Sequence, residues 1–496
     1  RQKSVPEQKL PQFKVVPEEK GGLTDEQGRA VSTRGGQLLL SASAGAGKTT
    51  VLTRRVVERL AEGASVSELL IVTFTRAAAA EMRARIAREL RGALKQETDP
   101  AQKEHLARQL VLLPQARIST MDSCCTNLLR RNFQKLGLAP DFRILQGGEW
   151  ELCREAAATE AMEALYEAGD EDFLACVDCF SGDRDDESFL AQLLRFFGKL
   201  ENDPTPLESL ADWSALYEKA KTPQDSLWGR ESARLTAERL SGLLGAFAFM
   251  RQCAEQGEGL SEKIVEQRCF EAEALEKAVA AGRCGEPILP FLDARKLSPT
   301  GKKAAELREV WQPINRVISA RDVAKAILND GALPSEEEFA KQRELSLSLL
   351  RGLTAAAERY CACLQKQYAR KNALPFQEIN RKALALLEES YDPETGLSTP
   401  SEYARELCSG KTGEGISEVL IDEFQDTNLL QNRIFLALSG GGQGLFCVGD
   451  LKQSIYRFRG ARPDLFARCL ASFSPEEGRF PQVQYLTRNF RSSQGV

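Results

Sequence analysis

The chain has 496 residues, of which 42% are hydrophobic and 28% charged, and its formal net charge is −5. These values are ordinary for a soluble protein of two to four domains with a sizeable core, and they argue against a generally basic nucleic-acid binder. The single histidine, His105, argues against a histidine-based metal centre or a histidine-dependent nucleophile.

The first 22 residues form a polar extension that lacks the apolar stretch of a signal peptide and begins without Met, so we expect a non-native start. No apolar run approaches the roughly 20 residues that span a bilayer, which predicts a protein that does not enter the membrane. Thirteen scattered cysteines fit a reducing bacterial cytoplasm better than a disulfide framework.

The stretch from Leu23 to Gln27 has two interpretations that local sequence leaves open. Thr24 fits the N-cap of a helix, with Gln27 three residues on closing a capping box. Alternatively, the amide of Gln27 reads the two-faced edge of adenine.

A phosphate-binding unit is predicted next, as a strand over Gln37–Ser41, a loop of small residues and an amphipathic helix from Lys48. The small residues let backbone N–H groups curl around a phosphate at the positive end of the helix. Lys48 would reach the β- and γ-phosphates of a nucleotide, and Thr49 would place its hydroxyl on Mg²⁺. The loop residues are Ala42, Ser43, Ala44, Gly45, Ala46 and Gly47.

Strands and helices then alternate, with a strand over Leu69–Phe74, a helix over Ala77–Leu90 and a strand over Ala116–Thr120. This alternation predicts an α/β fold with a parallel sheet covered on both faces. From residue 150 to 415 the texture becomes rich in Ala, Leu, Glu and Arg at helical spacing, which predicts a large all-helical insertion. We therefore expect a motor domain made of residues 23–149 and 416–496, interrupted by that insertion.

After the insertion, a short apolar strand ends in Asp422 and Glu423, two carboxylates that need a cation. Asp422 would hold Mg²⁺ through water, and Glu423 would orient and deprotonate the attacking water. The alternative, an exposed strand end with two solvated acids, is weaker because a phosphate-binding loop requires a second strand that ends in acids. Two more strands follow, over Leu445–Val448 and Val483–Leu486.

Seven blocks in this order resemble a superfamily 1A (UvrD/Rep-like) DNA helicase, a P-loop NTPase with a RecA-like sheet. The blocks are Gln27, ASAGAGKT, TFTRAAAAEMRARI, STMDS, IDEFQDTN, VGDLKQSIYRFRGA and LTRNFRS. The long insertion, STMDSCC and KQSIYRFRGARPDLF favour similarity to the AddA-type component of a bacterial ATP-dependent helicase–nuclease over the Rep, UvrD and PcrA repair helicases.

The resemblance implies roles in ATP hydrolysis. Gln453 resembles the sensor of the γ-phosphate, and Arg491 resembles an arginine that stabilises charge on the transferred phosphoryl group. Phe490 is similar to an aromatic that stacks on adenine, with Thr50 where the family often has Arg near the base. Gln425 and Asp426 resemble the part that links the hydrolysis site to the DNA-facing loops.

The resemblance also implies DNA contacts. Phe74, Tyr456 and Phe458 would stack on unpaired bases, with a core aromatic as the alternative for Tyr456. Hydroxyls would donate to phosphate oxygens, and Arg459 would contact DNA or bridge the DNA cleft to the ATP site. The hydroxyl residues are Thr73, Thr75 and Thr120. Asp122 stands where repair helicases carry His and is given no DNA contact because it would repel a phosphate.

The family resemblance thus implies the N-terminal ATPase part of a 3′→5′ DNA helicase–nuclease component, using ATP and Mg²⁺ on single- and double-stranded DNA ends in double-strand break repair, with an AddB-like partner in a heterodimer. It also implies a second motor domain and a nuclease domain beyond Val496. Three alternatives stay open: a stand-alone repair helicase, a nucleotide-gated DNA clamp without hydrolysis, and an ATPase that acts on another polymer such as RNA.

Overall fold

The computed structural model describes residues 14–15, 22–181, 187–226, 229–231, 234–235, 336–393, 395–410 and 415–490. The chain divides into two compact units. The first comprises Arg1–Ala161, Leu190–Pro206 and Tyr360–Val496, and the second comprises Met162–Phe189 and Leu207–Arg359. The boundaries of the insertion at residues 150 and 415 stay a prediction, since the compact units divide the chain at other positions.

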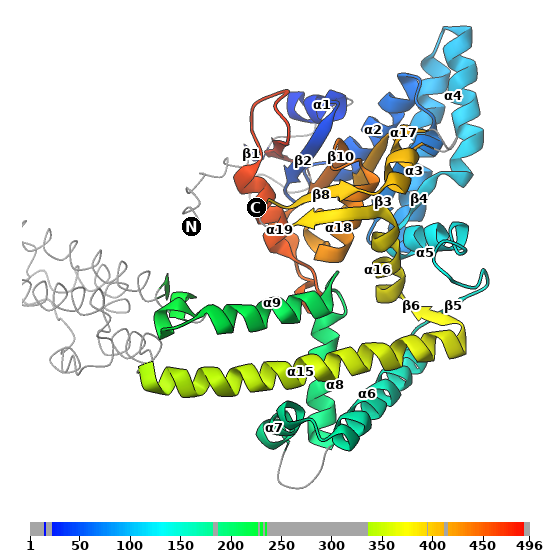
Figure 1. The fold of residues 1–496 in the computed structure, drawn as a ribbon. Helices are drawn as coiled ribbons and strands as arrows, with labels where there is room; N and C mark the ends of the chain where they lie inside the picture. The colour runs from blue at the N-terminus through cyan, green and yellow to red at the C-terminus, as the bar shows by residue number, and fades with distance from the viewer. Residues whose placement is uncertain are drawn as a thin grey trace, which may run out of the picture. The chain divides into compact units, whose positions relative to one another are not determined.

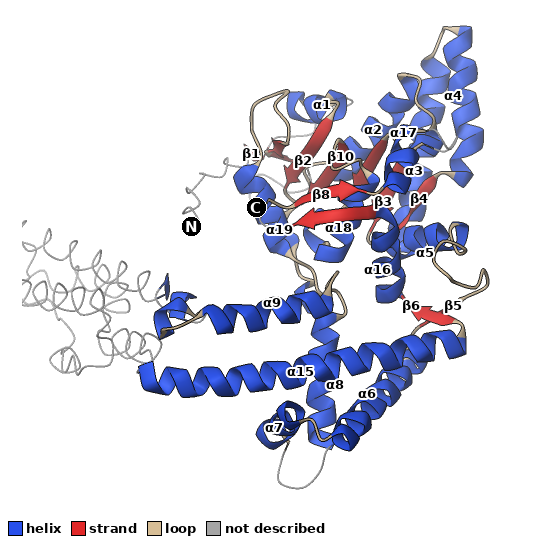
Figure 2. Ribbon diagram, in the orientation of Figure 1, coloured by secondary structure: helices blue, strands red, loops and turns tan. Residues whose placement is uncertain are grey.

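A six-stranded parallel sheet forms the centre of the first unit, in the order β11-β2-β10-β9-β3-β4 (Figures 1 and 2). The strands are β2 (Gly36–Ala42), β3 (Leu69–Thr73), β4 (Arg117–Thr120), β9 (Glu418–Ile421), β10 (Gly444–Gly449) and β11 (Gln482–Leu486). All six strands expected from the sequence are confirmed. Because β2 lies between β10 and β11, the two distant ends of the chain form one sheet.

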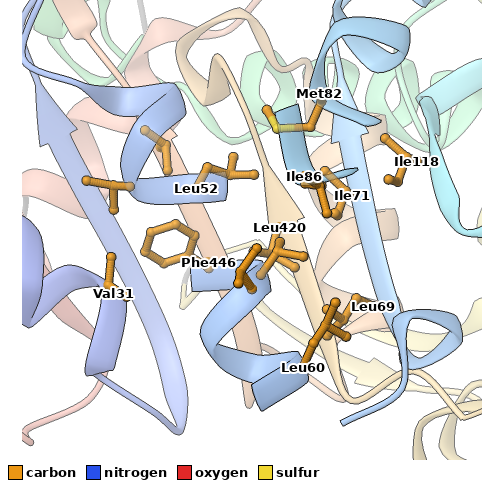
Figure 3. Close-up of a cluster of buried hydrophobic side chains, with 14 of the residues drawn as sticks. Val31, Leu52, Leu60, Leu69, Ile71, Met82, Ile86, Ile118, Leu420 and Phe446 are labelled. Atoms are coloured by element: carbon orange, nitrogen blue, oxygen red, sulfur yellow. The ribbon is translucent and has the colours of Figure 1, made fainter. Parts of the chain in front are cut away.

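Helices α1 (Asp25–Ser32), α2 (Lys48–Ala61) and α3 (Arg76–Gln96) bury their apolar residues against one face of this sheet (Figure 3). Alternate residues of each strand point to this face, so Leu38 and Leu40 of β2 join Leu420 and Phe446 there. The intervening residues, such as Leu39, are buried as well. Burial on both faces explains why these strands are apolar runs rather than alternating patterns.

The remaining elements of the first unit include α4 (Pro100–Leu112), α5 (Met121–Arg131), α16 (Phe376–Leu387), α17 (Glu402–Ser409), α18 (Leu429–Leu438) and α19 (Pro463–Ser472). Strands also occur outside the main sheet. Strands β5 (Arg143–Leu145) and β6 (Ala373–Pro375) pair in parallel, β7 (Glu388–Asp392) and β8 (Leu397–Pro400) form an antiparallel hairpin, and β1 (Lys14–Val15) pairs with β12 (Arg488–Asn489). The description of residues 150–415 as all-helical is therefore wrong for β6, β7 and β8.

In the second unit, every regular element among the described residues is a helix. Helix α7 (Glu171–Phe180) packs closely on α15 (Glu336–Lys371): a Cβ atom on Gly352 would lie 2.3 Å from the carbonyl oxygen of Asp172. The carboxylate of Asp172 also accepts hydrogen bonds from Ser348 and Arg351 of α15. Parts of α6 (Gly148–Ala168) and α8 (Glu187–Leu200), together with α9 (Pro206–Lys219), complete the unit.

A buried ion pair ties α2 to the sheet. Nε of Arg55 donates to Oε1 of Glu418 at 2.7 Å, while its Nη1 donates to the carbonyl oxygens of Ala30 and Thr33 at the end of α1. Arg59 adds a contact of 3.2 Å to the other oxygen of Glu418. Burial lowers the pKa of Arg55, and the carboxylate of Glu418 counteracts that effect. The first residue of β9 is thus fixed to the helix that carries the phosphate-binding loop.

We expect Arg55→Ala to lower the free energy of unfolding by about 3–5 kcal/mol, because it leaves a carboxylate buried with reduced compensation. The double variant Arg55→Met/Glu418→Leu should recover most of that loss. Chemical denaturation of the full chain measures both. The control is Arg85→Ala, which breaks an exposed ion pair with Glu81 on α3 and should cost less than about 1 kcal/mol. Equal losses for Arg55→Ala and Arg85→Ala would contradict the structural role of the buried pair.

Candidate nucleotide and nucleic-acid site

The loop between β2 and α2 has the backbone that a phosphate cradle requires. Gly45 and Gly47 have φ angles of +78° and +86°, which only glycine adopts without strain. A Cβ atom on Gly47 would also lie 2.6 Å from Nε2 of Gln27. Helix α2 begins at Lys48 without a side-chain cap, so its first N–H groups are directed at the space above the loop.

Gln27 supports this loop from below. Its Oε1 accepts from the backbone N–H of Thr24 at 3.1 Å, which completes the predicted capping box of α1. Its Nε2 donates to the carbonyl oxygen of Ala46 at 3.1 Å. The capping interpretation is confirmed, and the contact with the loop is one that sequence reasoning missed. The adenine interpretation stays a prediction.

The two acids at the end of β9 lie beside the loop. Nζ of Lys48 contacts Oε2 of Glu423 at 3.0 Å, across 375 positions of sequence. The backbone N–H of Asp422 donates to the carbonyl oxygen of Val72, which places Asp422 at the end of the neighbouring strand β3. Glu423 has a φ angle of +55°, in the left-handed region that non-glycine residues rarely adopt and that clusters at functional sites. The predicted meeting of Lys48 with these acids is observed.

Both aspartates flanking Glu423 have perturbed acidity. Burial, then the charge of Glu423, raises the pKa of Asp422 to about 6, while Lys48 opposes the shift. The same two causes raise the pKa of Asp426 to about 6. Crowded carboxylates with one ammonium group therefore favour the arrival of additional positive charge.

Gln425 connects these acids to the next strand. Its buried amide donates to Oε2 of Glu423 at 2.8 Å, and its Oε1 accepts from the backbone N–H of Asp450 at 3.0 Å. The carboxylate of Asp450 in turn accepts from Nε2 of Gln453 at 2.7 Å. Ser454 donates to the carbonyl oxygen of Gln425 at 3.2 Å. A continuous chain of hydrogen bonds thus runs from Glu423 to the loop that contains Gln453; the sensor role of Gln453 stays a prediction.

The last described residues close over the phosphate loop. The backbone N–H of Phe490 donates to the carbonyl oxygen of Gly45 at 3.0 Å. Thr487 donates twice to the carboxylate of Glu26 in α1, at 2.8 and 2.6 Å. Phe490 therefore lies next to the cradle, whereas Arg491 lies outside the described residues. Thr49 and the exposed Thr50 occupy the first turn of α2.

A second part of the site is aromatic. Phe74, which follows the end of β3, is exposed and stacks on Tyr456 with ring centroids 4.7 Å apart. Phe458 lies 6.0 Å from Tyr456 and is 78% exposed, so it is not a core residue. Tyr456 is half-buried, which leaves its assignment open. The backbone of Arg459 lies in η6 (Arg457–Arg459), and its side chain lies outside the described part of the structure.

A cavity of about 370 Å³ extends from the carboxylates Asp422 and Glu423 to Phe74 and Tyr456. Its wall includes Thr73, Thr75, Thr120 and Asp122. The hydroxyls of Thr75 and Thr120 cap α3 and α5, and that of Thr73 donates to the carbonyl oxygen of Thr75. Their predicted phosphate contacts thus compete with local hydrogen bonds.

Sequence reasoning missed two asparagines in this cavity wall, Asn202 and Asn380. Nδ2 of Asn380 in α16 donates to Oδ1 of Asp122 at 3.1 Å, and burial raises the pKa of Asp122. Both asparagines come from residues 150–415, where a helical pattern gives no signal for polar residues that point toward a site.

Strand order, loop and paired acids define a P-loop NTPase fold with a nucleotide site at the carboxyl ends of parallel strands. Within that class, the chain belongs to the UvrD/REP helicase family: the model of the "UvrD/REP helicase N-terminal domain" matches residues 23–474. This family membership implies the use of ATP.

The curated relatives share one description, that of the A component of an ATP-dependent helicase/nuclease. The chain is 34% identical over 495 residues to the protein so described from Pelotomaculum thermopropionicum, covering 96% of this chain and 38% of the relative. It is 34% identical over 493 residues to the one from Geobacillus thermodenitrificans, covering 95% of this chain and 38% of the relative. The chain thus spans little more than a third of these relatives. Among the described residues, no helix is long and apolar enough to cross a membrane.

The raised pKa of Asp422 gives a test of the site without nucleotide. A folded-state pKa above the unfolded value means that the ionised carboxylate destabilises the fold at pH 8. That penalty shrinks as pH falls below about 6 and disappears near the unfolded value of about 4. Asp422→Asn should therefore raise the melting temperature at pH 8, with a smaller gain at pH 5.

The matched control is Asp464→Asn on α19. The hydrogen bond from Arg462 lowers the pKa of Asp464, so this substitution should leave the melting temperature unchanged or reduce it at pH 8. Thermal scans at pH 8 and pH 5 compare the two variants. A lower melting temperature for Asp422→Asn at pH 8 would contradict a strained carboxylate site.

Proposed function

We propose that this chain is the ATP-hydrolysing motor part of a DNA helicase–nuclease that unwinds and processes DNA ends with 3′→5′ polarity in double-strand break repair. The observation that carries the proposal is the contact between Lys48 and Glu423 at 3.0 Å, with Gln425 joining Glu423 to the aromatic loop. A phosphate cradle, an acid pair and exposed aromatics in one unit fit a machine that couples nucleotide turnover to nucleic acid.

The residues present fit a Mg²⁺-bound nucleoside triphosphate. The glycine cradle accepts phosphate oxygens, and the ammonium of Lys48 is near enough to exchange Glu423 for a phosphate. Thr49 and Asp422 would hold the metal, which would neutralise charge on the phosphates. Glu423, freed from Lys48, would then act as general base on the attacking water, while Gln27 and Phe490 would border the nucleotide base.

Coupling to DNA follows from the path through Gln425. Displacement of Glu423 changes the partner of the Gln425 amide, and the opposite end of that amide holds the backbone of Asp450. Asp450 begins the loop that carries Gln453 and then Tyr456 and Phe458. A base stacked on these rings would contribute about 1–3 kcal/mol regardless of sequence. The buried position of Gln425 supports this path, because a fully enclosed amide cannot exchange its partners for water.

The shared description of the relatives favours the helicase–nuclease assignment over a stand-alone repair helicase. On the same basis we infer action on DNA ends, exonuclease activity in the longer protein and an AddB-like partner. The second candidate is a nucleotide-gated clamp without hydrolysis, and it is disfavoured because Lys48, Asp422 and Glu423 are all present in contact or in sequence with one another.

Two substitutions separate binding from chemistry. Lys48→Ala should abolish binding of Mg-ATP, measured by isothermal titration of the chain, because it removes the ammonium group at the cradle. Glu423→Gln should bind Mg-ATP as tightly as the parent or more tightly, since Lys48 loses a competing carboxylate. It should also lower hydrolysis stimulated by single-stranded DNA by about 10²-fold or more, the usual contribution of a general base.

A substitution at a distant exposed lysine serves as control: Lys103→Ala on α4 should change neither quantity. Unchanged Mg-ATP affinity in Lys48→Ala would remove the phosphate-cradle assignment. Normal hydrolysis by Glu423→Gln would remove Glu423 as the base, and absence of DNA-stimulated hydrolysis in the parent protein would favour the clamp.

A further inference from the structure

We propose that the end of α8 completes a second nucleotide subsite beside the aromatic loop, in which Lys199 and Arg457 hold a backbone phosphate of a single DNA strand whose base stacks on Phe458. The inference rests on the proposed action on DNA. It adds residues from the helical insertion, which none of the sequence motifs includes.

The subsite is a cavity of about 310 Å³, separate from the one that contains the acid pair. One wall is formed by Lys199, in the last turn of α8, and by Asn202 in the turn that follows. The opposite wall is formed by Arg457, Phe458 and Arg462. Asn202 also lines the larger cavity, so the two cavities share this side chain and lie next to each other along the aromatic loop.

The turn after α8 is fixed in place on two sides. Gly460, with a φ angle of +85°, closes the aromatic loop so tightly that a Cβ atom there would lie 2.6 Å from Nδ2 of Asn202. On the other side, Glu201 forms an ion pair with Arg154 of α6 at 2.9 Å, and its backbone carbonyl accepts from Arg381 of α16 at 3.0 Å. The wall that carries Lys199 is therefore held against the loop that carries Phe458.

The charge of this cavity suits a phosphate. Two of its charged groups already have partners, because Arg462 forms a bidentate pair with Asp464 and Asp203 accepts a hydrogen bond from a backbone N–H. Lys199 and Arg457 are exposed, and neither forms an ion pair within the described ranges of the chain. Two cations thus face this space, in a chain whose net charge is −5.

The aromatic component selects a single strand. Phe458 is 78% exposed and lies next to the Phe74–Tyr456 stack, so an unpaired base can reach its face. Aromatic faces beside cations bind single strands with little sequence preference, since every base has a stacking face and every nucleotide a phosphate. The subsite therefore extends the track from Phe74 and Tyr456 by one nucleotide toward α8.

The test is the salt dependence of binding of a labelled oligothymidylate to the full chain, measured by fluorescence anisotropy. Each phosphate contact to a single strand contributes about 0.7 to the slope of log affinity against log salt. Lys199→Ala should reduce the slope by about that amount, and Lys199→Arg should retain the parent slope. Lys199→Glu should weaken binding further at low salt, and it serves as a second variant that keeps the exposed position polar.

Two controls separate the possible causes. Lys103→Ala, which removes an exposed lysine of α4 that lines neither cavity, should leave affinity and slope unchanged. Phe458→Ala should weaken binding at every salt concentration with the parent slope, because stacking releases no counterions. All variants should bind Mg-ATP like the parent chain.

Parent-like slopes in both Lys199→Ala and Lys199→Glu, with normal binding by the parent chain, would overturn this subsite and leave the proposed motor function intact. Failure of the parent chain to bind the oligothymidylate would instead remove the DNA assignment and the subsite together. A reduced affinity of Lys199→Ala with an unchanged slope would assign Lys199 a structural role and would also overturn the proposal.

Discussion

An ammonium group and a carboxylate separated by 375 positions of sequence meet at 3.0 Å, and the rest of the site depends on that contact. It exists because β2 is inserted between β10 and β11, with β9 on the far side of β10. The loops at the carboxyl ends of parallel strands then share one edge of the sheet. The buried pair of Arg55 and Glu418 fixes α2 to β9, so the cradle and the acid pair belong to elements that cannot move independently.

The carboxylates of this site are arranged at a cost to the fold. Asp422 and Asp426 are partly desolvated beside Glu423, and Glu423 itself adopts a left-handed backbone. In the absence of other cations, Lys48 alone offsets three acidic groups. Such a site gains electrostatic stability when positive charge enters, and it resists the approach of a triphosphate without accompanying cations. The same energetic balance makes Lys48 a shared partner: a phosphate that binds Lys48 necessarily releases Glu423.

Sequence alone was sufficient for the parts of the fold that follow local rules. The six strands are apolar runs buried on both faces, and the cradle needs glycine at φ values that exclude other residues, so both leave a direct mark on the sequence. The meeting of Lys48 with the acids could be predicted because uncompensated charges at the end of a buried strand require a partner. The cap formed by Thr24 and Gln27 was one of two open interpretations, and the structure decides only that one.

The remaining parts depend on tertiary contacts that have no local pattern. Strands β6, β7 and β8 are short and partly polar, so they resemble breaks between helices. Asn202 and Asn380 belong to segments read as helical, where a polar residue that faces a cavity looks the same as one that faces water. The hydroxyls of Thr75 and Thr120 show the reverse case: their positions at strand ends suggested phosphate contacts, yet the same positions are helix N-caps. A threonine at the junction of a strand and a helix serves the fold first, and a ligand reaches its hydroxyl only by sharing an atom that the cap already uses.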